Sequence, residues 1–191
     1  MMTAITISRQ LGSFGDEVGQ AIADKLNFRV VCRGVINQAA VQAQVPEVAL
    51  ATIDDLGLLG IRPSQKDQQA YRREVRRVME ELADEGGVVI IGRAGQVILK
   101  ARPDVMHIKV IAPAALRAQR IADEHKISFK SAQSRITASD RSREKYLRRY
   151  YRSRWDDPEL YDLIVNTARL DPDQAACVVC QGFSQCLQTT S

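Results

Sequence analysis

The sequence predicts a three-layer α/β fold, in which helices cover both faces of a parallel β-sheet. Short apolar runs alternate along the chain with amphipathic segments of helical period, which is the order that a parallel sheet requires. The 191 residues match the size of one domain. No internal repeat or low-complexity linker divides them, so we expect a single domain over residues 1–191.

The strands are predicted from apolar runs that are rich in β-branched residues. The clearest is 88–91, where four such residues follow Gly86 and Gly87, as is typical of a strand buried on both faces. The other predicted strands cover residues 3–7, 28–32, 105–111 and 160–166.

The helices are predicted from apolar residues that recur every three or four positions. Pro113 favours a helix start, since proline suits the first turn. Between the second strand and the first long helix we expect short helices and turns. The predicted helices cover residues 18–26, 65–85, 113–125, 128 into the 140s or 150s, and a last segment from 171.

The charge is modest, but its make-up is informative. The net charge is +4, and 20 of the 27 basic residues are arginine. Guanidinium groups bind phosphate oxygens in pairs, so this bias favours phosphate handling; a compositional bias of the genome explains it equally well. No apolar run reaches the ~20 residues of a membrane span, and residues 1–11 have no signal-peptide core. We therefore expect a soluble, cytoplasmic protein without a membrane partner.

The cysteines do not predict a metal site. Cys177 and Cys180 form a C-x-x-C motif, with Cys186 nearby and Cys32 far away in sequence. A zinc site needs a second ligand pair at suitable spacing, and no histidine follows His125. We expect buried thiols in the last helix and no metal held by protein side chains alone.

The loop after the first strand is the first candidate site, because ligands of parallel sheets bind beyond the carboxyl ends of strands. Gly12, Ser13, Phe14 and Gly15 let backbone amides converge before a helix, which suits phosphate. The P-loop motif has Lys and then Ser or Thr after its last glycine, whereas this chain has Asp16 and Glu17. The alternative is an ordinary turn whose acidic residues complement the helix dipole.

Several motifs together resemble those of the cytidylate kinase-like family. They follow the family's order over nearly the whole chain: ITISRQ-x-GSFG at 5–15, IIGRA at 90–94, DRSR at 140–143, and YDLIVNT at 161–167. The resemblance implies a P-loop NTPase-type sheet with a helical lid. It also implies transfer of a phosphoryl group from ATP, with Mg²⁺, to a nucleoside monophosphate, CMP or dCMP being the expected acceptor.

The resemblance also implies roles for segments and residues. Residues 34–84 would form an acceptor-binding insert, and residues 113–155 the lid and the helix after it. Arg93 would bind the acceptor phosphate, although Ala94 replaces the aspartate that usually follows it. The other implied assignments are Gly12, Ser13, Phe14, Gly15, Asp16, Glu17 and Arg117 for the triphosphate, and Arg33, Asp140 and Arg141 for the acceptor. The sequence does not determine the oligomeric state, and a homodimer is one possible state.

Catalysis of phosphoryl transfer depends mainly on positioning and on cations that stabilise the transition state. We expect Arg120 and Arg143 to act in this way, from the lid. Arg9 is a candidate to replace the missing lysine; alternatively it pairs with Asp16 and pins the loop. Asp140 similarly has an alternative role as a surface salt-bridge residue.

Two other functions are weighed against the kinase. A nucleotide-binding regulator with weak catalysis would explain the missing lysine and the bulky Phe14. A nucleic-acid partner would use the arginines and tyrosines between residues 141 and 154, where cations and stacking rings alternate. Packing of Tyr146 and Tyr150 against the core is the more ordinary explanation, so nucleic acid is not favoured.

Overall fold

The protein folds around a five-stranded parallel sheet, as the sequence predicts. The computed structural model describes residues 2–32, 34–36 and 64–188. The predicted acceptor residue Arg33 and most of the predicted insert lie outside them. The strand order is β2-β3-β1-β4-β5, and all four pairings are parallel. The strands are β1 (Ala4–Arg9), β2 (Arg29–Val31), β3 (Val88–Ile91), β4 (Val105–Ile111) and β5 (Leu163–Asn166).

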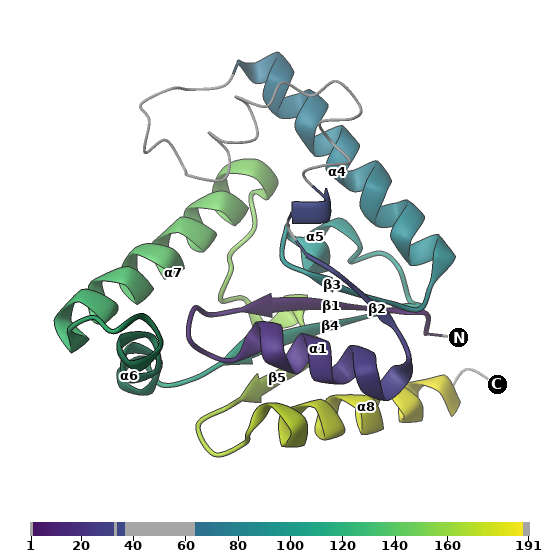
Figure 1. The fold of residues 1–191 in the computed structure, drawn as a ribbon. Coiled ribbons are helices and arrows are strands. Elements are labelled where there is room, and N and C mark those ends of the chain that lie inside the picture. The colour runs from purple at the N-terminus through teal and green to yellow at the C-terminus, as the bar shows by residue number, and fades with distance from the viewer. Residues whose placement is uncertain (1, 33, 37–63, 189–191) are drawn as a thin grey trace.

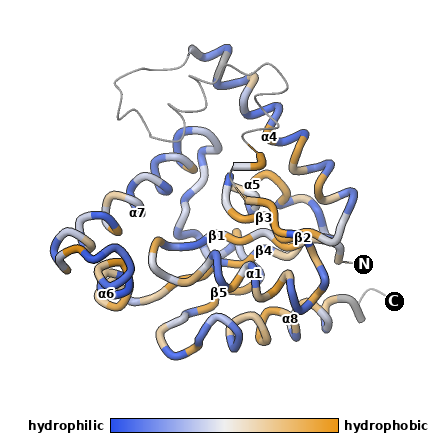
Figure 2. The backbone as a smooth tube through the Cα atoms, in the orientation of Figure 1, coloured by the Kyte–Doolittle hydropathy of each residue, from blue (hydrophilic) through white to orange (hydrophobic). Residues whose placement is uncertain are grey.

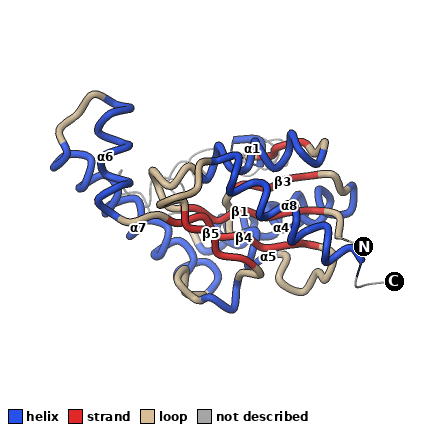
Figure 3. Tube along the Cα trace, turned by 90° about the horizontal axis from the view of Figure 1, so that it is seen from below, coloured by secondary structure: helices blue, strands red, loops and turns tan. Residues whose placement is uncertain are grey.

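Helices lie on both faces of the sheet, so the molecule has three layers (Figure 1; Figure 3). The α-helices are α1 (Gly15–Leu26), α4 (Gln65–Glu85), α5 (Gly95–Ile98), α6 (Ala114–His125), α7 (Phe129–Tyr151) and α8 (Pro172–Gln188), and a 3-10 turn, η1, covers Pro158–Leu160. The helix over residues 65–85 and the strands over 88–91 and 105–111 have the predicted bounds. The prediction missed α5, whose four residues are too few to show a helical period.

The central strand β1 places alternate residues in two separate cores, since successive side chains of a strand point to opposite faces. Ile5 and Ile7 pack with residues of α1 and α8, including Val18 and Phe183. Ala4 packs on the other face with residues of α4, α5 and α7. Apolar segments accordingly gather at the sheet in the middle of the molecule (Figure 2). The central strands therefore form a rigid base for the loops at their carboxyl ends.

Helices α6 and α7 form a hairpin that extends from the carboxyl edge of the sheet (Figure 1). It has a small core of its own, centred on Ala118, Ile121, Ala132 and Ile136. The far end of α7 returns to the main body, where Tyr146, Leu147 and Tyr150 join the core beneath α4. The hairpin thus has one end free of the sheet and one end packed on it.

Two predictions about the C-terminal region need correction. The last strand begins at Leu163 rather than at residue 160, because the Pro158 turn precedes it. The thiols of α8 are not buried: Cys177 is exposed and Cys180 is half-buried, because the face of α8 on the core carries Ala175, Val179 and neighbouring apolar residues. No helix in the described part of the chain is long and apolar enough to cross a membrane.

Candidate functional site

The loop between β1 and α1 is held in place by the buried Ser13. Its hydroxyl donates to the carbonyl oxygens of Gln10, at 2.8 Å, and Val110, at 3.1 Å. Its carbonyl oxygen accepts a hydrogen bond of 2.9 Å from the hydroxyl of Thr167. Ser13 therefore ties the loop to the ends of β4 and β5, and its side chain faces the interior.

Other amides of the same loop are open. Within the described residues, the N–H groups of Gly12, Phe14, Gly15 and Asp16 donate to no protein acceptor, whereas Ser13 N donates to Gln10 O at 3.3 Å. They lie at the N-terminus of α1, where the helix dipole adds partial positive charge. Converging open amides at a helix start form an anion site.

The loop conformation requires a glycine at position 12. Gly12 has a φ of +76°, and a Cβ there would lie 2.8 Å from the carbonyl oxygen of Arg117. Helix α6 therefore packs directly on the loop. Phe14 also has a positive φ, 61°, which is costly for a residue with a side chain.

Arg9 occupies a slot between two glycines. A Cβ on Gly15 would lie 2.2 Å from the Arg9 Cβ, and a Cβ on Gly92 would lie 2.8 Å from its Nη1. The Arg9 side chain therefore extends from the end of β1 towards the end of β3, where its guanidinium lies beside Gly92. Arg9 Nη2 lies 3.0 Å from the Asp16 carboxylate, while the buried Nε has no hydrogen-bond partner in the described part of the chain. The pairing that we considered for Arg9 and Asp16 is thus present.

Arg143 reaches the same region from α7. Burial, and then the nearby charge of Arg9, lower the pKa of Arg143 to about 10. Its hydrogen-bond partner among the described residues is Ser139, on its own helix. Arg9 and Arg143 are therefore two adjacent cations with one directly paired carboxylate, Asp16, an arrangement that favours an anionic ligand.

Arg120 is fixed to the loop. Its guanidinium carbon lies 3.8 Å from the centroid of the Phe14 ring. It also donates to the carbonyl oxygen of Gly12, at 3.2 Å, and to that of Thr167, at 2.7 Å. Burial lowers the pKa of Arg120. Arg120 thus joins α6, the loop and the end of β5, and no pattern in the sequence indicated Thr167 as its partner.

Arg117 lies beneath the loop and binds Asp140. The two side chains form a forked pair, with Nη2 to Oδ2 at 2.9 Å and Nη1 to Oδ1 at 3.2 Å. Arg117 also donates to the carbonyl oxygens of Ala112, at 3.0 Å, and Leu11, at 3.3 Å. This pair connects both helices of the hairpin to the loop. The contacts of Arg117 with a triphosphate, and of Asp140 with an acceptor, remain predictions.

The predicted acceptor side lies at the end of β3. Arg93 is buried, has a φ of 52°, and its guanidinium carbon lies 5.9 Å from the Tyr71 ring centroid. Arg141, in contrast, is exposed on α7. The structure therefore brings Arg93 near the tyrosines of the core and leaves Arg141 at the surface.

A buried polar cluster near this site was not predicted. Lys109 donates to the carbonyl oxygen of Trp155 at 2.7 Å and lies over the rings of Trp155 and Tyr161. Burial lowers the pKa of Lys109. The Trp155 indole in turn donates to Ser8, at 2.9 Å. The sequence signal was a lysine inside an apolar strand, and its effect is to fix the chain that follows α7.

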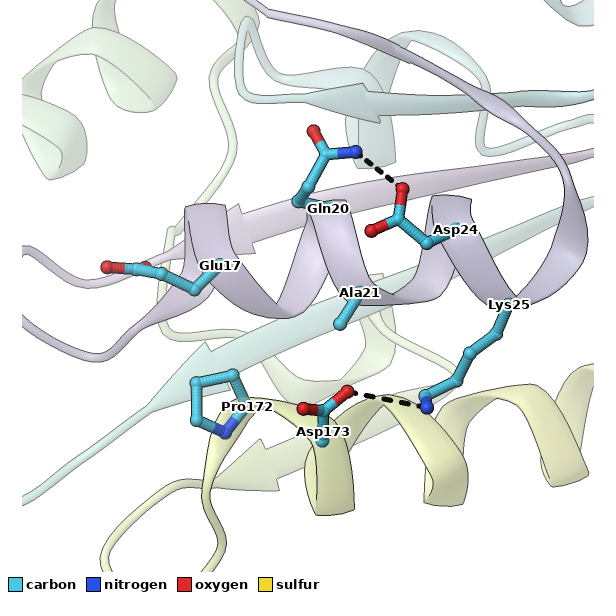
Figure 4. Close-up of a pocket in the computed structure, with 7 residues that line it drawn as sticks. All are labelled: Glu17, Gln20, Ala21, Asp24, Lys25, Pro172 and Asp173. Atoms are coloured by element: carbon cyan, nitrogen blue, oxygen red, sulfur yellow. Dashed lines mark hydrogen bonds and ion pairs between the residues drawn. The ribbon is translucent and has the colours of Figure 1, made fainter.

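A cavity of about 500 Å³ brings many of the predicted residues together. The predicted residues that line it are Arg9, Gly12, Phe14, Gly15, Asp16, Glu17, Arg120 and Arg143. A second cavity, of about 510 Å³, lies between α1 and α8 (Figure 4). Its charged lining is mostly carboxylate, and its single cation, Lys25, pairs with Asp173 at 3.4 Å. Of these two cavities, the first is the one whose lining suits a polyphosphate.

Sequence comparisons identify relatives that match this chain over most of their length and most of its own. The model of the cytidylate kinase-like family matches residues 4–169. A cytidylate kinase of Ignicoccus hospitalis is 30% identical over 172 residues, which are 90% of this chain and 94% of the relative. A cytidylate kinase of Halobacterium salinarum is 28% identical over 175 residues, 92% of this chain and 86% of the relative.

Structural comparisons agree on the fold. A crystal structure of an uncharacterized protein from Eubacterium ventriosum superimposes with a TM-score of 0.76 at 19% identity, covering 97% of this chain and 99% of that one. A gluconokinase from Sinorhizobium meliloti gives 0.60 at 15% identity, covering 99% and 97%. The sheet is therefore that of the P-loop kinases, and the chain belongs to the cytidylate kinase-like family.

Proposed function

We propose that the protein transfers the γ-phosphoryl group of ATP to a nucleoside monophosphate, with CMP or dCMP as the acceptor. The observation that carries this proposal is the position of Arg9, which lies in its glycine slot beside the open amides and between the ends of β1 and β3. A cation at this point can contact phosphates bound on the loop and a group brought to Gly92 and Arg93.

The donor site is built from the loop and from three arginines. The open amides of Gly12, Phe14, Gly15 and Asp16 would bind the β- and γ-phosphates. Arg9 and Arg143 would neutralise charge on the transferred group, as the lysine does in other P-loop proteins. Arg120 would keep the loop and the end of β5 together while it faces the same cavity.

The residues present fit a magnesium ion carried mainly by the nucleotide. Mg²⁺ usually binds one or two carboxylates together with substrate phosphates. Asp16 and Glu17, which line the cavity, are the carboxylates that would hold it. When bound, the ion would shield phosphate charge, and the chain itself would supply the arginines and amides.

The acceptor would bind on the Arg93 side. Its phosphate oxygen would attack the γ-phosphorus as the bond to the β-γ bridging oxygen breaks, which gives ADP and a nucleoside diphosphate. The Arg117–Asp140 pair would act as a positioning element, because it fixes α6 and α7, and hence Arg143, relative to the loop. Closure of the hairpin would exclude water.

The test is an assay of ADP release with ATP, Mg²⁺ and each nucleoside monophosphate in turn. We expect CMP and dCMP to give the highest turnover. Arg93→Ala should lower activity by at least about 100-fold, since a charge-assisted contact with phosphate contributes about 1.5–3 kcal/mol or more. Arg77→Gln, an exposed change on α4, should leave activity unchanged. Full activity of Arg93→Ala would remove Arg93 from the site.

The Arg9–Asp16 ion pair favours a second candidate, a nucleotide-binding regulator with little turnover. Asp16 lies 3.0 Å from Arg9 and competes with any phosphate for it. Calorimetric binding of ATP without ADP release, for every monophosphate, would select this function. In the kinase, Asp16→Asn should tighten the binding of ATP measured without Mg²⁺, because the charge that competes for Arg9 is removed.

A further inference from the structure

We propose a second anion site on the protein, between α4 and the end of α7, that binds the phosphate group of a small phosphorylated molecule. The site is a cavity of about 270 Å³ lined by Gln69, Arg72, Arg73, Arg76 and Tyr151. Arg93 and the loop at Gly12 are not among its lining residues, so it is separate from the proposed donor site. It does not depend on the proposed function.

The cavity concentrates cations on one side of α4. Arg72, Arg73 and Arg76 are exposed, and none of the lining residues in the described part of the chain is a carboxylate. Residues four apart are neighbours on a helix, so Arg72 and Arg76 repel each other, as do Arg73 and Arg77. Like-charge pairs of this kind destabilise a helix. An anion bound between them would remove that repulsion.

The arginines of α4 differ in whether a carboxylate neutralises their charge. Arg77 pairs with both Glu74 and Glu81, and Arg76 pairs with Glu80 at 3.4 Å. Within the described residues, Arg72 and Arg73 form no ion pair with a carboxylate. The uncompensated charge therefore lies at Arg72 and Arg73, two of the three arginines that line the cavity, and not along the whole helix.

An aromatic ring and an amide complete the cavity. The guanidinium carbon of Arg72 lies 5.4 Å from the centroid of the Tyr151 ring, a distance at which the ring attracts the cation. Gln69, one turn before Arg73, supplies an amide that can donate to an oxygen. Forked guanidinium donors with an amide match the tetrahedral oxygens of phosphate.

Contacts connect this cavity to the proposed acceptor side. The Tyr151 ring lies 5.8 Å from that of Tyr146, whose hydroxyl is 3.5 Å from that of Tyr71. Arg93 lies over the Tyr71 ring. A ligand that orders Arg72 and Tyr151 would therefore act on the same group of tyrosines that packs beside Arg93.

The size of the cavity favours a small ligand. Pockets for drug-sized ligands have about 300–1,000 Å³, and this one is slightly smaller. Inorganic phosphate and the phosphate of a mononucleotide present the same oxygens to the arginines. The experiment has to distinguish these two sources from each other and from a polymer.

The experiment measures the rate at which phenylglyoxal modifies each arginine of the full-length protein, mapped by mass spectrometry, with and without inorganic phosphate. At a phosphate concentration ten times its Kd, about one tenth of the sites stay open, so Arg72, Arg73 and Arg76 should react roughly tenfold more slowly. Arg77 should react at an unchanged rate. Equal rates with and without phosphate at Arg72 and Arg73 would overturn the proposal.

Variants and ligands make the test specific. Arg72→Gln combined with Arg73→Gln should abolish the protection of Arg76, whereas Arg77→Gln, with its change of charge on the same helix, should preserve it. If the protection of Arg76 were lost equally in the double variant and in Arg77→Gln, the effect would be one of general charge, and the proposed site would be overturned. Protection by CMP at lower concentration than by phosphate would assign a nucleotide as the ligand. Protection by a single-stranded oligonucleotide alone would overturn the small-molecule proposal.

The same map separates this proposal from the proposed function. Protection of Arg9 and Arg143 by ATP reports on the donor site, and protection of Arg72 and Arg73 by phosphate reports on the second site. Each result can fail while the other holds.

Discussion

The guanidinium of Arg120 stacks on the ring of Phe14, 3.8 Å from its centroid, although Phe14 has a left-handed backbone conformation. Glycine would adopt such a conformation without steric cost. The stack offsets part of the strain, since a guanidinium over an aromatic ring contributes about 0.5–1 kcal/mol at exposed sites and more when it is buried.

Phe14→Gly should therefore be less harmful than Phe14→Ala. Both lose the stack, but alanine keeps the left-handed strain of about 1–2 kcal/mol, and glycine adds about 0.5–1 kcal/mol of unfolded-chain entropy. We expect the glycine variant to be more stable than the alanine variant by about 0.5–1 kcal/mol, as measured by urea denaturation. An alanine variant as stable as the glycine variant would show that the loop is unstrained at this position.

The Arg117–Asp140 pair should be strongly coupled. Asp140→Asn leaves Arg117, whose side chain is only 5% exposed, without its counter-charge. Loss of one partner of a buried pair costs about 3–5 kcal/mol, and partial exposure of Asp140 should reduce this to about 2–3 kcal/mol. A double-mutant cycle with Arg117→Met should give a coupling energy above about 1 kcal/mol. The exposed pair Glu144–Arg148 is the control, where we expect less than about 0.5 kcal/mol.

Gly92→Ala should disturb nucleotide binding through Arg9. The added Cβ would lie 2.8 Å from Arg9 Nη1, so the guanidinium has to leave its slot. We expect ATP affinity to fall about as much as in Arg9→Gln, and the double variant to show no further loss, because both changes remove one interaction. Calorimetry measures the affinities.

Gly86→Ala is the matched control for that experiment. Gly86 also has a left-handed φ, +69°, but a Cβ there has room beside Thr3, at 3.4 Å. Both alanine variants should lose about 1–2 kcal/mol of stability from backbone strain. A loss of ATP affinity in Gly86→Ala equal to that in Gly92→Ala would attribute the effect to strain rather than to Arg9.

Stability in acid should depend on Asp104. Hydrogen bonds from Arg102, and from Thr3, lower the pKa of Asp104 from 3.8 to about 2. The carboxylate therefore stabilises the fold fully above pH 4, and this contribution is lost as the pH falls from about 4 to 2. It amounts to at most about 2 kcal/mol. Asp104→Asn should flatten the acid limb of the stability curve, whereas the exposed Asp156→Asn should alter it much less.

The regular elements were predictable because their signals are local. Four β-branched residues in a row and the helical period of residues 65–85 specify a strand and a helix without help from the rest of the chain. Helix α5 was missed because it has four residues, and the beginning of β5 because the turn at Pro158 depends on how the chain leaves α7.

The site was predictable in its components and in the local Arg9–Asp16 pairing, but not in its long-range pairings. Gly12, Gly15 and Arg9 stand out in the sequence, and a turn with open amides follows from them. The Arg117–Asp140 pair joins residues 23 positions apart on two helices, so it depends on how the hairpin closes. The contact of Arg120 with Thr167 links segments 47 positions apart, and no local pattern indicates it.

In the proposed donor site, the position of Arg9 would also determine how the protein selects among anions. Its guanidinium already has a carboxylate beside it, on a side chain that is 64% exposed and can turn outward. A singly charged or weakly hydrogen-bonding ion gains little by exchanging with that carboxylate. A polyphosphate would gain more, because it would contact Arg143 and the loop amides in the same step. In the proposed donor site Asp16 would thus act as a built-in competitor that raises the threshold for occupancy and excludes weaker ions from this cavity.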